Sequence, residues 1–356
     1  MTSAPTFAAS ALDRLRPAWR DRAVMANLVA QIVIVVTGGA VRLTASGLGC
    51  SSWPSCEPGH FTPTLHGATS YHPFVEFGNR TLTGVLVVVA LAVVVLAGRD
   101  RSRSKAYRAL AWVPIVGVLV QAVVGGMAVK YDLPPAVVGS HMLISMVLVA
   151  ASAWLWVRSK ETDAAPSWLV TSATRVLLSL LCVAAAVVVV LGVVTTGAGP
   201  HSGDDEVGYR FAVDPLTMAR VHAGSVWVFV ALLALTVYQL QVRARRTAPA
   251  PELGYQQDDG TPQAVRGFVP VPERTDLSVP LRAGYRLLGV TLAQAAIGYV
   301  QVATHLPIGL VNLHMLGAAI LVTALTLFVG ALRTRRHAPV AEPATHAVDA
   351  PDAAAA

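Results

Sequence analysis

Long apolar runs separated by short polar segments make up most of the chain. Each run approaches the roughly 20 residues that a helix needs to cross the hydrocarbon core of a membrane. The pattern predicts eight transmembrane helices, at residues 24–41, 75–98, 109–129, 136–157, 173–196, 217–240, 284–303 and 307–331.

The composition excludes a soluble globular protein. Of the 356 residues, 54% are apolar and only 13% are charged, whereas soluble domains carry about 25% charge. The mean hydropathy of +0.57 also argues against a disordered or collagen-like chain. Three cysteines are too few for a small fold held together by disulfides.

Basic residues indicate the orientation of the predicted helices. Placing the N-terminus in the cytoplasm puts 22 of the 27 Lys and Arg residues in cytoplasmic segments, and the remaining five lie on or near the opposite face: Arg42, Arg80, Lys130, Arg210 and Arg220. The positive-inside rule therefore predicts a multi-pass protein of the cell membrane with both termini in the cytoplasm. It also explains the net charge of +7 without a nucleic-acid partner.

Three polar segments flank or interrupt the predicted helices. Residues 1–23 contain four arginines and precede an apolar run that is too long for a signal-peptide core, so we expect an uncleaved cytoplasmic N-tail. Residues 243–282 are predicted to be a flexible cytoplasmic linker, and residues 332–356 a disordered cytoplasmic tail.

The third and fourth predicted spans are repeated as the seventh and eighth. The segment Gln121–Leu143 aligns without gaps to Gln294–Leu316, and ten of the 23 positions are identical. A weaker match aligns Thr37–Val41 with Thr195–Gly199, so that Asn79 of the second span corresponds to His222 of the sixth. The repeat predicts an all-α membrane protein whose eight transmembrane helices form two tandem pseudo-symmetric four-helix bundles, at residues 24–160 and 173–331.

Only three of the ten histidines lie inside predicted spans, and all three are expected at a similar depth below the outer surface: His141, His222 and His314. Polar groups at such a depth are costly and by default indicate a functional site. Imidazoles on facing helices could ligate a haem iron from both sides. The alternative is that each histidine forms a structural hydrogen bond between helices.

The two halves differ in this layer. The second half has the pair His222 and His314, whereas the first has Asn79 and His141 and so lacks one imidazole. We therefore expect a second haem-like molecule, held from one side, in the first half. Zinc is disfavoured because thiolate or carboxylate neighbours that would complete a tetrahedral site are missing.

Glu76 lies three residues before Asn79 and on the same helix face, which suits a role in proton transfer. The alternative is an ion pair with Arg80, one turn further on. His72 is expected to be a loop residue.

Three arginines are expected at the outer ends of the first, second and sixth spans: Arg42, Arg80 and Arg220. They suit either pairing with haem propionates or snorkelling to the membrane surface.

Cys50 and Cys56 fall in the first outer loop, on the oxidising side of the membrane. They could form a structural staple or a redox-active pair, and spacing does not distinguish these roles. Cys182, in the fifth span, is expected to be a packing residue.

The motifs TGGAVRLTASGLGCSSWPSC (37–56), EFGNR (76–80), SHML and LHML together resemble the haem A synthase family. The resemblance covers residues 24–331 and implies oxidation of a porphyrin methyl group of haem O to a formyl group, by successive hydroxylation with water as the oxygen source. In this family the C-terminal half holds haem b and the N-terminal half binds haem O. Many members have a histidine where this chain has Asn79.

The resemblance assigns roles to individual residues. It makes His222 and His314 the haem b axial ligands, His141 a ligand of the substrate haem, and Glu76 the catalytic carboxylate, and it implies a disulfide between Cys50 and Cys56. It further implies haem O synthase, a farnesyltransferase, and an electron acceptor as partners. A homo-oligomer is compatible with the sequence.

Other functional classes explain less of the sequence. A b-type haem electron carrier accounts for His222 and His314 but not for Glu76 beside a half-empty site. A quinone-linked thiol oxidoreductase usually needs a second cysteine pair, which Cys182 alone cannot supply. A transporter is disfavoured because the buried polar residues lie near one surface rather than at the midplane.

Overall fold

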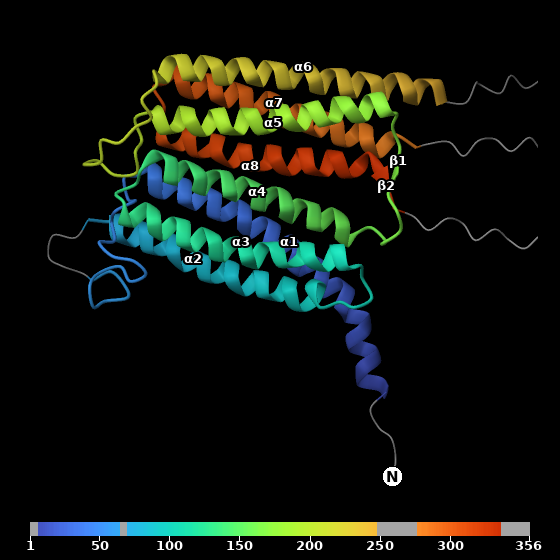
Figure 1. Cartoon of the computed structure of the whole chain (residues 1–356), viewed down its shortest axis with the longest axis horizontal. Coiled ribbons are helices and arrows are strands. Elements are labelled where there is room, and N and C mark those ends of the chain that lie inside the picture. Colours follow the sequence, from blue (N-terminus) through green and yellow to red (C-terminus); the bar gives the residue numbers. More distant parts are fainter. Residues whose placement is uncertain (1–5, 65–69, 248–275, 336–356) are drawn as a thin grey trace, which may run out of the picture.

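The chain folds into long helices that run side by side (Figure 1). The computed structural model describes residues 6–64, 70–247 and 276–335, without the side chains of residues 6–16 and 247. Eight helices lie in this part of the chain: α1 (Thr6–Leu43), α2 (His72–Val93), α3 (Lys105–Lys130), α4 (Pro135–Ser159), α5 (Ser172–Ala198), α6 (Pro215–Thr247), α7 (Ser278–Ala303) and α8 (Ile308–Ala331). The predicted all-α fold class is confirmed.

Seven of the helices in the described part of the chain are long and apolar enough to cross a membrane. The exception is α7, which carries Arg282 and Arg286 in its first three turns and Gln294 and Gln301 further along. It packs against α6 and α8 and runs alongside them (Figure 1). The chain is a multi-pass membrane protein.

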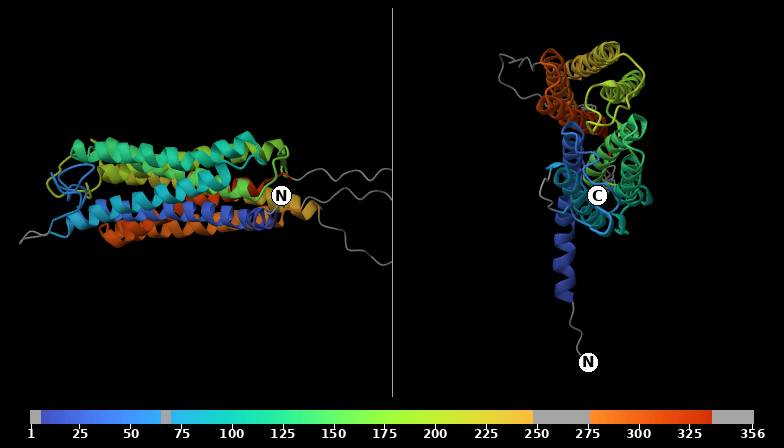
Figure 2. Two further views of the ribbon diagram at one scale, coloured as in Figure 1. Left: turned by 90° about the horizontal axis from the view of Figure 1, so that it is seen from below. Right: turned by 90° about the vertical axis from the view of Figure 1, so that its left-hand side faces the viewer.

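Several helices extend beyond the predicted spans. Helix α1 begins at Thr6, and its first turns project from the bundle (Figures 1 and 2), so residues 6–23 of the expected N-tail are helical. Helix α6 continues to Thr247, into the expected linker. Residues 248–275 of that linker and 336–356 of the expected tail lie outside the described residues.

Seen end-on, α1–α4 and α5–α8 form two neighbouring groups (Figure 2). Helices α1, α4 and α8 pack together between the groups, and a buried apolar cluster that includes Leu28, Val149 and Ala319 joins them. A larger apolar cluster, including Phe229 and Phe328, fills the α5–α8 group.

The sequence repeat is also a structural repeat. The α3–α4 and α7–α8 hairpins turn in the same way, since each turn contains two consecutive residues with a positive φ. The angles are 55° at Asp132 and 57° at Leu133, and 61° at His305 and 60° at Leu306. The positive φ is unfavourable for residues with a side chain, so both hairpins share an uncommon backbone conformation.

Ion pairs join segments of both groups at the end opposite the Cys50–Cys56 loop. The buried Arg158 contacts Glu161 at 2.7 Å and Asp163 at 2.9 Å. Arg103, before α3, contacts Asp163 at 2.9 Å, and Arg333, after α8, contacts Glu161 at 3.2 Å. We call these five residues the inner ion-pair network.

A two-stranded sheet reinforces this end, because β1 (Ser167–Trp168) pairs antiparallel with β2 (Arg333–Thr334). The first residues of the expected C-terminal tail are thus held against the connection between α4 and α5.

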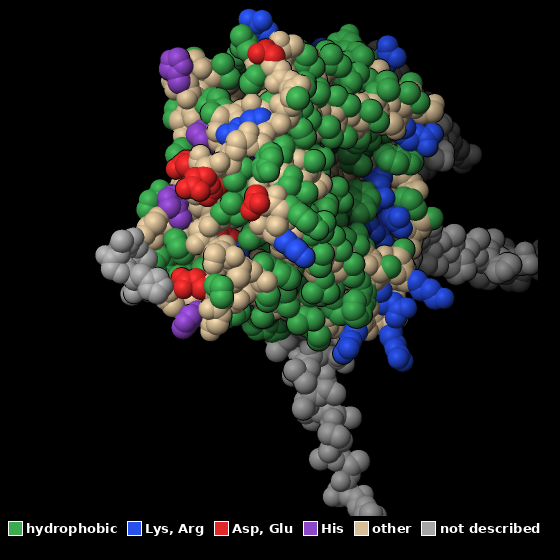
Figure 3. All heavy atoms as spheres, turned by 60° about the vertical axis from the view of Figure 1, so that its left-hand side comes forward, with side chains coloured by type: hydrophobic (Ala, Val, Ile, Leu, Met, Phe, Trp, Pro, Cys, Tyr) green, Lys and Arg blue, Asp and Glu red, His purple; other side chains and the backbone are tan. Residues whose placement is uncertain are grey.

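The two ends of the molecule differ in charge. In Figure 3, Asp, Glu and His side chains gather at the end that carries the loops 44–71 and 199–214, whereas Lys and Arg gather at the other end. An apolar belt lies between them, as expected for a surface that contacts lipid.

Candidate functional site

One cavity of about 910 Å³ reaches into both helix groups. Eight candidate residues from five helices line it: Arg42, Glu76, Asn79, Arg80, His141, Arg220, His222 and His314. The structure therefore brings together residues that the sequence places up to several helices apart.

In the second half, His222 of α6 and His314 of α8 both line the cavity. The Nδ1 atoms of both rings are buried and have no hydrogen-bond partner among the described residues. Glycines make room for the rings, because a Cβ on Gly192 would lie 3.1 Å from Cε1 of His222, and one on Gly298 would lie 3.3 Å from Cε1 of His314. Two imidazoles that line one largely apolar cavity fit a haem.

His141 on α4 and His314 on α8 are held in the same way, each by a glutamine of the preceding helix. Gln121 donates a hydrogen bond to the backbone carbonyl of His141 at 2.9 Å, and Gln294 donates to that of His314 at the same distance. A Cβ on Gly125 would lie 3.3 Å from the His141 ring, which matches Gly298 in the other half.

The two glutamines were not among the residues predicted for the site. Gln121 and Gln294 each begin one copy of the gapless repeat, so the alignment contained the signal that could have identified them.

The first half has an amide where the second has an imidazole. The Thr37 hydroxyl of α1 donates a hydrogen bond to Oδ1 of Asn79 at 2.7 Å, and Asn79 lines the cavity from α2. His141 is thus the one histidine among the described residues that lines the cavity from α1–α4. The arrangement offers a haem in this half an imidazole from one side only.

Glu76 is only 5% exposed, and both its carboxylate oxygens accept hydrogen bonds. The backbone N–H of Cys50 donates to Oε2 at 2.7 Å, while Nε and Nη2 of Arg80 donate to Oε1 at 3.1 and 2.5 Å. The ion pair considered from the sequence therefore forms, and it forms at the cavity wall.

Arg80 also ties the loop that contains Cys50 and Cys56 to α2. Its Nη1 donates to the backbone carbonyls of Ser52 and Ser55 at 2.9 and 3.0 Å. These residues lie between Cys50 and Cys56, which form a disulfide. The disulfide loop, Arg80 and Glu76 are consequently one hydrogen-bonded unit.

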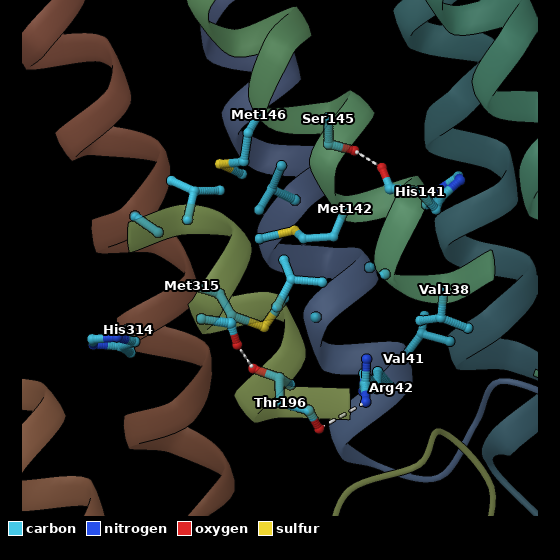
Figure 4. Close-up of a pocket in the computed structure, with 18 of the residues that line it drawn as sticks. Val41, Arg42, Val138, His141, Met142, Ser145, Met146, Thr196, His314 and Met315 are labelled. Atoms are coloured by element: carbon cyan, nitrogen blue, oxygen red, sulfur yellow. Dashed lines mark hydrogen bonds between the residues drawn. The ribbon is translucent and has the colours of Figure 1, made fainter. Parts of the chain in front are cut away.

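Arg42 connects the two helix groups at the end that carries the Cys50–Cys56 loop. It donates to the backbone carbonyls of His201 and Thr196 at 3.0 and 3.1 Å. Figure 4 shows Arg42 beside Thr196, and it shows His141 and His314 on either side of a stretch lined by methionines. Arg220 lines the cavity from α6.

The remaining candidates lie away from this constellation. His72 is the first residue of α2 rather than a loop residue, and its Nδ1 lies 2.8 Å from Oγ of Ser46. Cys182 of α5 is a free thiol, partly buried against the apolar cluster of α5–α8. Within the described ranges, no group of three or more His, Cys, Asp or Glu residues is placed to hold a metal ion.

Comparison with known proteins points to one family. Residues 21–201 match the family model COX15-CtaA, described as a cytochrome oxidase assembly protein. The "Heme A synthase" of Bacillus pumilus is 31% identical over 122 residues, that of Geobacillus kaustophilus 28% over 143, and that of Exiguobacterium sibiricum 32% over 124.

These matches are partial. They cover 34%, 39% and 34% of this chain and 38%, 43% and 39% of the relatives, respectively. The chain therefore aligns with about two fifths of the length of the curated relatives that it matches.

Proposed function

Since the chain belongs to the COX15-CtaA family of cytochrome oxidase assembly proteins, we propose that it is a haem A synthase. It oxidises a methyl group of haem O to a formyl group within the membrane. The conversion removes four electrons and four protons and takes its oxygen from water, so the protein needs both a route for electrons and a group that accepts protons.

The second half holds haem b. His222 and His314 would bind its iron, and Gly192 and Gly298 allow their rings to approach the neighbouring helices. Haem b bound here supplies a one-electron relay between the substrate and an external acceptor. Gln294 fixes the backbone of His314 and thereby orients its imidazole.

The first half binds the substrate. His141, positioned by Gln121, holds the iron of haem O from one side. Arg220, together with Arg42 and Arg80 at the outer ends of α1 and α2, supplies positive charge for the propionates. The difference between the halves, Asn79 in one and His222 in the other, distinguishes the substrate site from the cofactor site.

Glu76 accepts a proton from the methyl group or from the attacking water. Each carboxylate oxygen has two lone pairs, so the hydrogen bonds from Cys50 and Arg80 leave further acceptor positions. The hydrogen bonds from Nε and Nη2 of Arg80 hold the carboxyl group at the cavity wall.

The observation that carries this proposal is that Glu76 and His141 share one cavity with the pair His222 and His314. An electron carrier would need only the histidine pair. A thiol oxidoreductase would need a second cysteine pair, whereas Cys182 is the free cysteine of the described chain.

The proposal extends to orientation and partners. The basic end of the molecule faces the cytoplasm with both termini, and the disulfide loop faces outward (Figure 3). Haem O synthase delivers the substrate, and an electron acceptor receives the electrons.

The substitution Glu76→Gln tests the chemistry. It keeps the size of the side chain but removes the base, so we expect haem A formation to fall by about 100-fold or more while haem b is retained. The measurement is the haem composition of purified protein supplied with haem O. Glu57→Gln, in the outer loop, is the matched control and should form haem A normally; normal output from Glu76→Gln would refute the assigned role.

A further inference from the structure

The structural repeat allows the walls of the two halves to be compared position by position. The register that pairs Asn79 with His222 also pairs Gly84 of α2 with Trp227 of α6. The register that pairs Gln121 with Gln294 likewise pairs Gly126 of α3 with Tyr299 of α7. Two large aromatic residues in one half therefore correspond to two glycines in the other.

The aromatic pair closes the wall of the second half. Trp227 donates a hydrogen bond from Nε1 to the hydroxyl of Tyr299 at 3.0 Å, across the contact between α6 and α7. Both residues line the cavity, and they are 56% and 55% exposed.

The corresponding wall of the first half is open. Gly84 lines the cavity and is also exposed on the surface, and a Cβ built there would have no atom of the described chain within 4 Å, beyond its own helix turn. The cavity therefore extends to Gly84, where the wall of the first half carries no side chain.

A loop residue covers the other glycine. A Cβ on Gly126 would lie 2.8 Å from the ring of Trp53, which comes from the disulfide loop and itself lines the cavity. Gly126 thus provides the space in which Trp53 packs against α3.

The surroundings of the opening are apolar. Val85 and Val88 on α2 and Val123 on α3 are all exposed and lie within helices long and apolar enough to cross a membrane. A hydrocarbon chain that leaves the cavity here would remain in an apolar environment, whereas a polar group would have to be desolvated.

We propose, on the basis of the haem A synthase function, that the opening at Gly84 between α2 and α3 is the exit for the farnesyl-derived tail of haem O. The tail passes from the porphyrin pocket into the bilayer, so the protein need not enclose it. In the second half the pair Trp227 and Tyr299 blocks the same route, and that half accepts only a porphyrin without a tail.

The substitution Gly84→Trp tests the proposal by placing in the first half the residue found in the second. The full-length protein, with haem b bound, is titrated with haem O and separately with tail-less iron protoporphyrin IX, and binding is followed by difference absorption. We expect haem O to bind at least about 10-fold more weakly, which is a change of about 1.4 kcal/mol. Binding of the tail-less porphyrin should stay within about twofold of wild type, because the ring pocket is unchanged.

Gly78→Trp is the matched control. Gly78 lies on the same helix, is exposed, has open space around its Cβ position, and does not line the cavity. This variant should bind both porphyrins as wild type does.

Two results of the titration would contradict the proposal that the tail leaves at Gly84. One is unchanged haem O binding by Gly84→Trp, and the other is an equal loss of affinity for both porphyrins. The titration measures binding and does not depend on turnover. If Gly84→Trp weakens the binding of haem O alone but the wild-type protein makes no haem A, the tail exit stands and the proposed function is contradicted.

A converse variant, Trp227→Gly, opens the wall of the second half. We expect protein produced in the presence of haem O to contain haem O at the histidine pair in place of part of its haem b, as measured by haem extraction. An unchanged haem b content would contradict the role assigned to Trp227.

Discussion

At the scale of single residues, the site consists of a few polar groups whose neighbours define their roles. His222 and His314 have unpaired Nδ1 atoms at a shared cavity. Glu76, by contrast, is held by Arg80 and by the backbone N–H of Cys50. The histidines and Glu76 could be selected from the sequence because charged and polar residues are rare in apolar helices. The hydrogen bond from the backbone N–H of Cys50 to Glu76 could not be predicted from the sequence. It forms only because the loop that contains Cys50 folds back onto α2.

Replacing either histidine of the second half should remove the haem b signature. In His222→Ala or His314→Ala one axial ligand is absent, so we expect the low-spin b-type absorption spectrum to be lost. The spectrum of the purified protein is the measurement. A full low-spin spectrum in both variants would exclude the proposed ligation, and His60→Ala, an exposed loop substitution, should leave it unchanged.

At the scale of helices, most boundaries follow from hydropathy. The run predicted at 136–157 is Pro135–Ser159 in the structure, and that at 173–196 is Ser172–Ala198. Hydropathy did not indicate the first turns of α1, because a polar helical segment carries no membrane signal. It also could not reveal the contact between Trp227 and Tyr299, which depends on how α6 and α7 face each other.

The duplicated α3–α4 and α7–α8 hairpins allow paired substitutions. In Gly298→Val the added side chain meets the ring of His314, so we expect partial loss of haem b. Gly125→Val, at the corresponding site beside His141, should impair haem O binding and retain haem b. The ratio of haem b to protein separates these outcomes, and equal loss in the two variants would argue against separate sites.

At the scale of the whole molecule, the two helix groups are joined at both ends. Arg42 binds backbone carbonyls of the second group at the outer end, and the inner ion-pair network joins them at the other. Partial burial raises the pKa of Asp163 in this network. Hydrogen bonds from Arg103 and from the amide and hydroxyl of Ser104 outweigh that effect and hold the pKa well below its usual range.

The inner ion-pair network should stabilise the fold in a pH-dependent way. Because folding lowers the pKa of Asp163, its contribution is complete above the unfolded value of about 3.9 and is lost as the pH falls through the folded value. Asp163→Asn should lower the free energy of unfolding by about 1–3 kcal/mol at neutral pH. Thermal unfolding in detergent measures this, and a midpoint no lower than that of Asp205→Asn, an exposed loop control, would contradict it.

The central claim is that this protein oxidises a methyl group of haem O, and haem extraction tests it most directly. The full chain is expressed in membranes that contain haem O and no other haem A synthase, and the extracted haems are separated and identified by mass. The account predicts a formyl-bearing haem A together with haem b. Haem O recovered unchanged beside haem b would contradict it and would indicate an electron carrier.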